Sequence, residues 1–287
     1  MWTKTVGVGL SKYVLFPEFR DHDATRVELN SAIMALLAGS QMAIHLLKLT
    51  EGSDHLLAEV FPSIPHIARF NLTTNKASDI LNAADSHLGA MAVPYVLGAH
   101  EDYMKACLKL VEQHNGVNLD AESTGSARQH DKLQTVATAT FQAETLEQFH
   151  LVRKMRNCMV HAGGAVNRPL ENHCGTMSAA AKAGWDKLAG YEPDFRVGHG
   201  NVTLGHRETV AALAITKNLA RQANQILQTC ISRTSWGEIL MKDLDAGPGL
   251  PKDASERLRK VRGYARFNYS ALRFTEHEIT TLNATYP

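Results

Sequence analysis

The amino-acid sequence predicts an all-α protein, an antiparallel helical bundle, from two observations. Apolar residues recur at helical spacing over several long stretches, and segments rich in Gly, Pro and Asn separate these stretches. Long helices that are joined by irregular loops usually pack as antiparallel neighbours. Residues 195–204 carry glycines between apolar residues and can form a small β-hairpin insertion. We therefore expect four to six substantial helices with at most a very small sheet.

Turn residues set the expected ends of the helices. Pro94 is expected to kink or divide the longest stretch, and Gly163-Gly164 to end another. The expected helices cover residues 24–49, 54–60, 77–113, 131–161, 177–189, 207–232, 253–266 and 275–283. We expect three regions: an N-terminal helical segment (1–75) that packs on a bundle (76–235), and a basic C-terminal helical appendage (236–287).

Composition narrows the class of protein. The chain has 287 residues, of which 44% are hydrophobic and 21% charged, so a disordered chain is not expected. A net charge of +1 means that nucleic acid could bind only at a local basic patch. The four cysteines are far apart, which is typical of a reduced chain without a disulfide scaffold or zinc site. We find no signal peptide and no run of about 18 apolar residues, so we expect a cytoplasmic protein without a membrane span.

One motif near the end of the stretch 131–161 contains residues that could catalyse a reaction. It consists of Arg156, Asn157, Cys158, Met159, Val160 and His161. This pattern resembles the signature of the HEPN family, in which an arginine, a polar residue and a few mostly apolar residues precede a histidine. The helix before it, the glycines after it and the acidic-aromatic segment Glu101-Asp102-Tyr103 also resemble the family. The resemblance covers roughly residues 80–230.

The resemblance implies a HEPN-type bundle, a homodimer and a ribonuclease whose Arg and His side chains from both protomers line one cleft. We therefore expect a metal-independent endoribonuclease of the toxin or phage-defence kind. It would act on RNA without a cofactor, and an antitoxin or a nucleotidyltransferase is a candidate partner. The alternative is a non-catalytic HEPN module that binds nucleic acid or a partner protein.

The residues themselves fit such chemistry. Cleavage without a metal needs a base that takes the 2′-OH proton, and His161 suits this role because histidine titrates near neutrality. Arg156 can stabilise the charge that builds on the phosphate oxygens. The products would be a 2′,3′-cyclic phosphate and a 5′-hydroxyl. Asn157 can hydrogen-bond His161 or a phosphate oxygen. We expect Glu101, within an apolar stripe, to pair with Arg156 or with Arg153.

Helix geometry complicates this site. Five residues along an ideal helix turn about 500°, so Arg156 and His161 would point about 140° apart. Either the helix loosens before Gly163, or a symmetric dimer brings two copies together. The alternative interpretation is that neither residue is catalytic: Arg156 would be a surface residue of the helix, and His161 would cap the last carbonyl groups of the helix.

Other residues are weaker candidates for a catalytic or metal-binding role. Arg168 and His173 repeat the Arg-x4-His spacing, but Pro169 follows the arginine in a segment that we expect to be a loop, so we take this match as chance. Cys158 lies on the apolar side of its helix and is expected to be a core thiol. Histidines and a cysteine gather loosely without ligand spacing on an expected element, so we expect no metal site. These residues are His173, Cys174, His199 and His206.

The stretch 257–273 carries six basic residues, no acidic residue and three interleaved aromatic ones. Such a segment can follow a phosphate backbone and stack bases. The nucleic-acid-binding candidates there are Arg259, Arg262, Tyr264 and Arg266, with Arg153 added from the motif helix. The alternative is an amphipathic helix with a solvated basic face.

Overall fold

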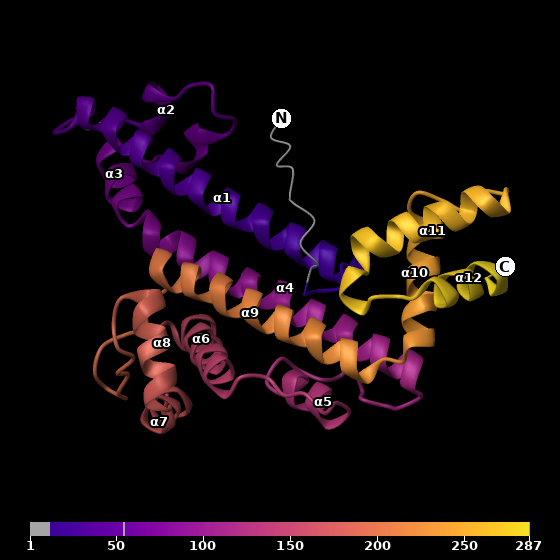
Figure 1. Cartoon of the computed structure of the whole chain (residues 1–287). Helices are drawn as coiled ribbons and strands as arrows, with labels where there is room; N and C mark the ends of the chain where they lie inside the picture. The colour runs from indigo at the N-terminus through magenta and orange to yellow at the C-terminus, as the bar shows by residue number, and fades with distance from the viewer. Residues whose placement is uncertain (1–11, 54, 287) are drawn as a thin grey trace. The chain divides into compact units, whose positions relative to one another are not determined.

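The computed structural model describes residues 12–53 and 55–286, and this part of the protein is helical (Figure 1). It contains 12 α-helices, 72% helix and no strand. The expected all-α class is therefore confirmed. The predicted hairpin at 195–204 does not form a strand pair, and only an isolated bridge joins Arg196 to His199. The first eleven residues of the predicted segment 1–75 lie outside the described residues.

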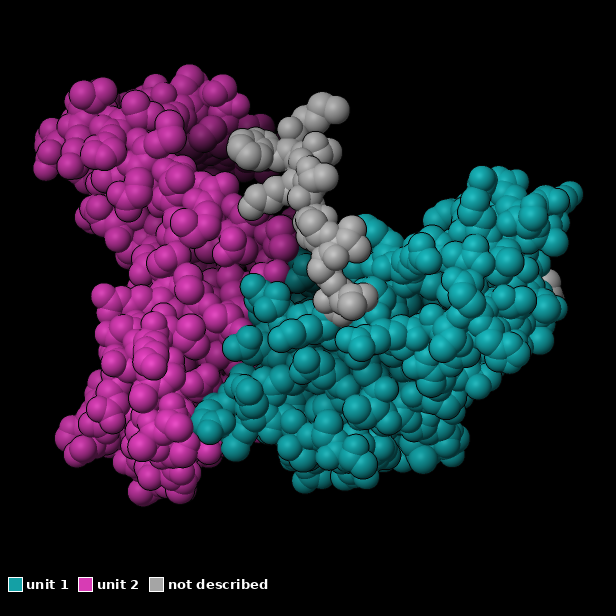
Figure 2. Space-filling model, viewed as in Figure 1, with its two compact units in different colours: residues 1–25, 98–146, 216–287 teal, residues 26–97, 147–215 magenta. Residues whose placement is uncertain are grey.

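The chain divides into two compact units (Figure 2). Unit 1 comprises Met1–Thr25, Gly98–Leu146 and Thr216–Pro287, and unit 2 comprises Arg26–Leu97 and Glu147–Ile215. The boundaries after residues 75 and 235 do not coincide with this division, so the three-region scheme stays a prediction. Four helices contribute residues to both units: α1 (Pro17–Leu47), α4 (Ala84–Asn115), α6 (Ala143–Ala162) and α9 (His206–Cys230).

Unit 1 has an aromatic core next to an ion pair between half-buried Arg20 and buried Asp243. Phe16 lies 5.6 Å from Trp236 and 6.5 Å from Tyr103, measured between ring centroids. Arg20 donates two hydrogen bonds to Asp243, of 2.7 and 2.9 Å. The helices of this unit that lie wholly within it are α5 (Gln129–Thr135), α10 (Arg233–Ala246), α11 (Ala254–Asn268) and α12 (Glu276–Thr285), with the short 3-10 turn η3 (Ser270–Leu272).

Unit 2 encloses Trp185 and Leu170, which are fully buried. Gly89 of α4 approaches the backbone of Leu204 so closely that a Cβ there would overlap the carbonyl group, so this contact requires glycine. The elements that lie wholly within unit 2 are η1 (Lys48–Thr50), α2 (Leu57–Val60), η2 (Ile67–Phe70), α3 (Thr74–Asn82), α7 (Arg168–Thr176) and α8 (Ala179–Ala189).

Two expected helix boundaries were wrong. The stretch 77–113 divides at Ala83, not at Pro94, which lies inside α4. Val93 and Val96 beside the proline are buried, and their packing outweighs a helix-interior penalty of about 3 kcal/mol. The stretch 131–161 is two helices, α5 and α6, and the segment 136–142 between them holds one Val, two Thr and one Phe, which are weaker helix formers than Leu or Ala.

Two helices were missed, α7 and α10. The segment that holds α7 was expected to be a loop because of its Asn, Pro and Gly content. Asn167, however, caps the helix by accepting a 3.0 Å hydrogen bond from the Leu170 amide, and Pro169 stands in the first turn. Both residue types favour helix starts. The composition that indicated a loop is in fact a helix-start signal.

The apolar helix α1 differs from what the sequence predicted. The segment Pro17–Thr50 is long and apolar enough to cross a membrane, with a mean hydropathy of 1.5 over 18 residues of which 22% are buried. We expected no such segment. The core helix of a soluble protein and a signal sequence near the N-terminus can meet the same criterion of length and hydropathy, so the segment is compatible with several locations.

Candidate functional site

The end of α6 carries the HEPN-like motif. Gly163 and Gly164 take positive φ angles of 57° and 91°, and the Gly164 amide donates a 3.0 Å hydrogen bond to the Cys158 carbonyl. This bond and the two left-handed glycines turn the chain out of the helix, a backbone conformation that glycine adopts without strain. The glycines therefore end α6 as predicted. The suggestion that the helix loosens before Gly163 is wrong, because α6 stays helical to Ala162.

Within one chain, Arg156 and His161 do not form a compact site. Both lie in regular helix, so their side chains leave α6 about 140° apart. His161 is exposed in the last turn, whereas Arg156 is half-buried. Asn157 is half-buried and about 40° from His161, so it shares that side of the helix. Cys158 is fully buried, which confirms the expected core thiol.

Arg156 lies in a cationic environment. Its Nε is buried and has no hydrogen-bond partner in the described part of the chain. Burial, and then the charge of Arg156, lower the pKa of the Arg153 guanidinium. Arg153 itself donates a 3.4 Å hydrogen bond to Nδ1 of His150. Two half-buried guanidinium groups thus lie near each other, and Arg153 contacts a neutral ring rather than a carboxylate.

Glu101 has a different partner from the one predicted. Its carboxylate lies 3.1 Å from Nζ of Lys105, one turn further along α4, and its side chain is 26% exposed. The prediction that Glu101 needs Arg156 or Arg153 as its cation was therefore wrong. The error came from the helical projection, which placed Glu101 within an apolar stripe but ignored the cation four residues later.

A second group of cations, which sequence reasoning missed, joins α6 to α7. Nε2–H of His173 donates a 2.8 Å hydrogen bond to the Glu147 carbonyl, which ties the two helices together. Lys154 and His173 line one hollow of about 530 Å³ with Arg168. The Arg168–His173 match was dismissed because its segment was expected to be a loop, but it lies in helix α7. The Arg-x4-His spacing of Arg168 and His173 was therefore the sequence signal that could have indicated this group of residues.

Burial and nearby positive charges lower the pKa values of the basic side chains in this group. Burial lowers the pKa of His150 to about 4, and the charges of Arg153 and of Lys154 add to this effect. Burial also lowers the pKa of His173, again with a contribution from Lys154. The pKa of Lys154 falls because of burial and because of Arg153. Both imidazoles are therefore neutral at pH 7, and neutral nitrogens of this kind can accept protons.

The basic C-terminal stretch is largely engaged within unit 1. Arg262 of α11 lies 2.7 Å from Glu276, and the ring of Tyr264 lies 6.3 Å from that of Tyr269, measured between centroids. Arg259 and Arg266 are exposed, so they keep the predicted ability to meet a phosphate backbone. Arg266 lines a hollow of about 560 Å³. Two of the four candidates there are thus committed to internal contacts.

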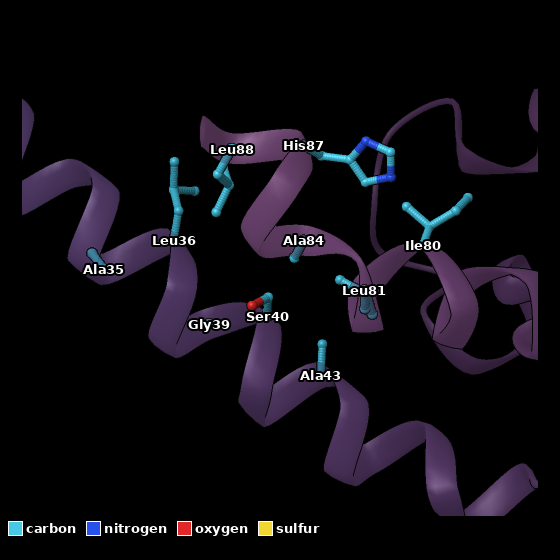
Figure 3. Close-up of a pocket in the computed structure, with 10 residues that line it drawn as sticks. All are labelled: Ala35, Leu36, Gly39, Ser40, Ala43, Ile80, Leu81, Ala84, His87 and Leu88. Carbon is cyan, nitrogen blue, oxygen red and sulfur yellow. The ribbon is translucent and has the colours of Figure 1, made fainter. Parts of the chain in front are cut away.

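An apolar pocket of about 540 Å³ lies between α1 and the segment α3–α4 in unit 2 (Figure 3). Leu36 and Leu88 extend into the space between the ribbons, and His87 is the one ring among the labelled residues. The hydroxyl of Ser40 in its lining donates a 2.7 Å hydrogen bond to the Leu37 carbonyl rather than to His87, so we assign no catalytic role to this pocket. Among residues 12–53 and 55–286, no group of three His, Cys, Asp or Glu side chains could hold a metal ion.

Comparisons with models of known protein families, with curated proteins and with solved structures found no match to this chain. The likeness to HEPN proteins therefore rests on the residues of α6 and its surroundings. The function has to be argued from the same residues.

Proposed function

We propose that the protein is a metal-independent endoribonuclease of HEPN type, in which Arg156 of one protomer and His161 of another act on one RNA strand. The observation that carries this proposal is the environment of Arg156. Its Nε is buried without a partner, and Arg153 adds a second positive charge. A desolvated cation without a carboxylate is costly unless an anion arrives, and an RNA phosphate is such an anion.

The roles follow from the side chains. His161 is exposed at the end of α6, where an RNA strand can reach it, and it would take the proton from a 2′-OH. The 2′-oxygen attacks the adjacent phosphorus, the bond to the 5′-oxygen breaks, and that oxygen takes a proton from a water molecule. Arg156 would stabilise the negative charge on the phosphorane-like oxygens. Asn157, on the same side of α6 as His161, would orient the imidazole.

The proposal requires a dimer because of the geometry of helix α6. One chain presents Arg156 and His161 about 140° apart, so an Arg and a His that act on the same phosphate come from different copies. A twofold axis near the end of α6 would place two such composite sites side by side. The toxin or defence role, with an antitoxin or nucleotidyltransferase partner, extends the same proposal and is tested through the genes that neighbour this one.

The first experiment is cleavage of labelled total RNA by the full-length chain in the presence of EDTA. We expect His161→Ala and Arg156→Gln to lower the rate by about a hundredfold or more. His277→Ala and Arg207→Gln are matched controls, because both residues are exposed and helical, and each variant removes the same group. Both controls should cut like wild type. Fragments should end in a 2′,3′-cyclic phosphate.

Mixing the two inactive variants tests the dimer. If each site combines an arginine and a histidine from different copies, a mixed dimer keeps one intact site. With random pairing, an equimolar mixture would recover about a quarter of the wild-type rate. No recovery, although the mixed dimer forms, would mean that the residues do not act across copies. Absence of cleavage by wild type at high concentration would remove the catalytic proposal.

A second candidate is a non-catalytic module that binds nucleic acid. It is favoured by the regular end of α6, which keeps Arg156 and His161 apart within one chain. In that case wild type and His161→Ala would bind single-stranded RNA with equal affinity and neither would cut it. Arg156→Gln would weaken binding without changing its preference among sequences.

A further inference from the structure

The hollow between α6 and α7 has the composition of an anion site. It is lined by Lys154, Arg168, Pro169, Asn172, His173 and Thr176, with no carboxylate among these residues. The five lining residues of α7 span about 140° of that helix, so they form one continuous face. Lys154 of α6 forms the opposing wall. Three residues that can carry a positive charge thus converge from two helices on a space of about 530 Å³.

Glu147, the nearest acidic residue on α6, is committed elsewhere. Its carboxylate accepts a 2.6 Å hydrogen bond from the Ser178 amide, and its carbonyl accepts the bond from His173. These two contacts fix α7 and the start of α8 against α6. Glu147 therefore builds the frame of the hollow through backbone bonding rather than an ion pair with Lys154.

Positive charge near the hollow disfavours further protonation. The pKa of Lys154 is lowered by burial and by Arg153, and that of His173 by burial and by Lys154. Lys154 and Arg168 are therefore the cations of the hollow at pH 7, and His173 is neutral. Arg168 touches Glu171 at 3.3 Å, but its side chain is 76% exposed, so other donors of its guanidinium stay available. An anion in the hollow would relieve the repulsion between cations that are already partly removed from water.

We propose that this hollow binds a phosphate group. A tetrahedral anion offers oxygens on several sides, which suits an ammonium from Lys154 and a guanidinium from Arg168 that approach from different helices. The amide of Asn172 supplies a neutral donor. His173 donates through Nε2 to Glu147, so Nδ1 is the nitrogen that can accept a proton from a protonated phosphate oxygen. This site does not depend on RNA cleavage at His161, which lies about 10 Å further along α6.

Calorimetric titration of the full-length chain with inorganic phosphate at low ionic strength tests the proposal. We expect saturable binding to wild type, and a rise in Kd of about tenfold or more for Lys154→Gln and for Arg168→Gln, because each loses a charge-assisted hydrogen bond. Lys187→Gln on α8 is the control, because it removes the same charge from an exposed helical lysine outside the hollow. Its Kd should match wild type within about twofold.

A second variant guards against loss of folding. Asn172→Asp changes an exposed residue of nearly the same shape and places a negative charge in the hollow. It should abolish phosphate binding while the far-UV circular dichroism stays unchanged. Absence of saturable binding to wild type in 10 mM phosphate, on the order of the weakest useful affinity, would overturn the proposal. Equal binding by wild type and Asn172→Asp would overturn it as well.

Competition identifies the source of the phosphate. If 5′-AMP displaces inorganic phosphate, the site accepts a terminal phosphate of a small molecule. If an oligoribonucleotide without terminal phosphates displaces it, the site accepts an internal phosphodiester. Either result supports the site, and failure of both would overturn it for any biological phosphate. His161→Ala should bind phosphate like wild type, so a failure of the cleavage proposal leaves this result unaffected.

Discussion

Three arginines of unit 1 and two arginines of α6 in unit 2 differ in their partners. In unit 1, Arg20, Arg233 and Arg262 each meet a carboxylate within 2.7 Å. On α6 in unit 2, Arg153 contacts a neutral histidine, and Nε of Arg156 is buried without a partner in the described part of the chain. Arg20 and Arg262 in unit 1 and Arg153 and Arg156 on α6 are all half-buried, but among these four only Arg20 and Arg262 have a carboxylate partner within residues 12–53 and 55–286.

This difference separates structural arginines from candidate functional ones. A guanidinium that is paired and hydrogen-bonded contributes to folding, because both charges are satisfied inside the protein. A guanidinium that is partly buried beside another cation lowers the stability of the folded chain. Such a group is tolerated where it serves a function, and a bound anion would offset its unfavourable free energy. The comparison therefore predicts opposite effects on stability when arginine contacts are removed in the two regions.

The largest effect is expected at Asp243. This carboxylate accepts hydrogen bonds from Arg20 and, at 2.8 Å, from Tyr269. Burial raises the pKa of Asp243, but the hydrogen bonds of these two residues outweigh it and hold the pKa below its usual value. Asp243→Ala leaves a half-buried guanidinium unpaired and should lower the free energy of unfolding by about 3 kcal/mol. Urea denaturation measures this change in the free energy of unfolding.

Asp245→Ala on the same helix is the control, because Asp245 is exposed. Its effect should stay within about 0.5 kcal/mol. If the two variants lose the same stability, the Arg20–Asp243 pair does not have the structural role that we assign to it, and the contrast between the two units disappears.

An intermediate effect is expected at acidic pH. The folded pKa of His150 is about 4, below its unfolded value near 6.5. The unfolded chain therefore binds the proton first, so stability is complete above pH 6.5 and is lost as the pH falls towards 4. Each such histidine contributes a slope of at most about 1.4 kcal/mol per pH unit, less for a partly exposed ring. The pKa of the fully buried His100 is also lowered, by burial and by His130.

His150→Gln sharpens this test. The glutamine keeps an acceptor for Arg153 but cannot titrate, so the midpoint of urea unfolding should fall less between pH 6.5 and 5 than in wild type. His277→Gln, at an exposed position of α12, is the matched control and should follow wild type. Parallel curves for all three proteins would mean that the surroundings of His150 do not lower its pKa.

Local signals made part of this fold and site predictable. Gly163 and Gly164 end α6 where expected, and α9 and α12 start and stop within two residues of the predicted bounds. Those signals are caps and periodic apolar faces, which act within one helix. The partner of Glu101 was also local, since Lys105 is four residues away, and was missed because a buried position was assumed.

The rest depends on contacts that one sequence does not show. Pro94 was expected to kink or divide a helix, and it does not divide α4, in which neighbouring residues are buried. Lys154 was not singled out, because its significance arises only when α7 packs beside it with Arg168 and His173. The apolar spacing of a helix indicates which side is buried, but not which helix covers it.

The smallest expected effect, and the one that decides the comparison, is at Arg156. Arg156→Met keeps an unbranched stem in the same space but removes the buried Nε and the repulsion of Arg153. We expect the free energy of unfolding to stay equal or to rise by about 0.5 kcal/mol. Arg20→Met, the same change in unit 1, should instead lower it, because Asp243 loses its ion-pair partner. Urea denaturation of the two variants side by side gives the answer. A stability loss for Arg156→Met as large as that for Arg20→Met would show that Arg156 has a structural partner, and the case for its action on a phosphate would lose its main support.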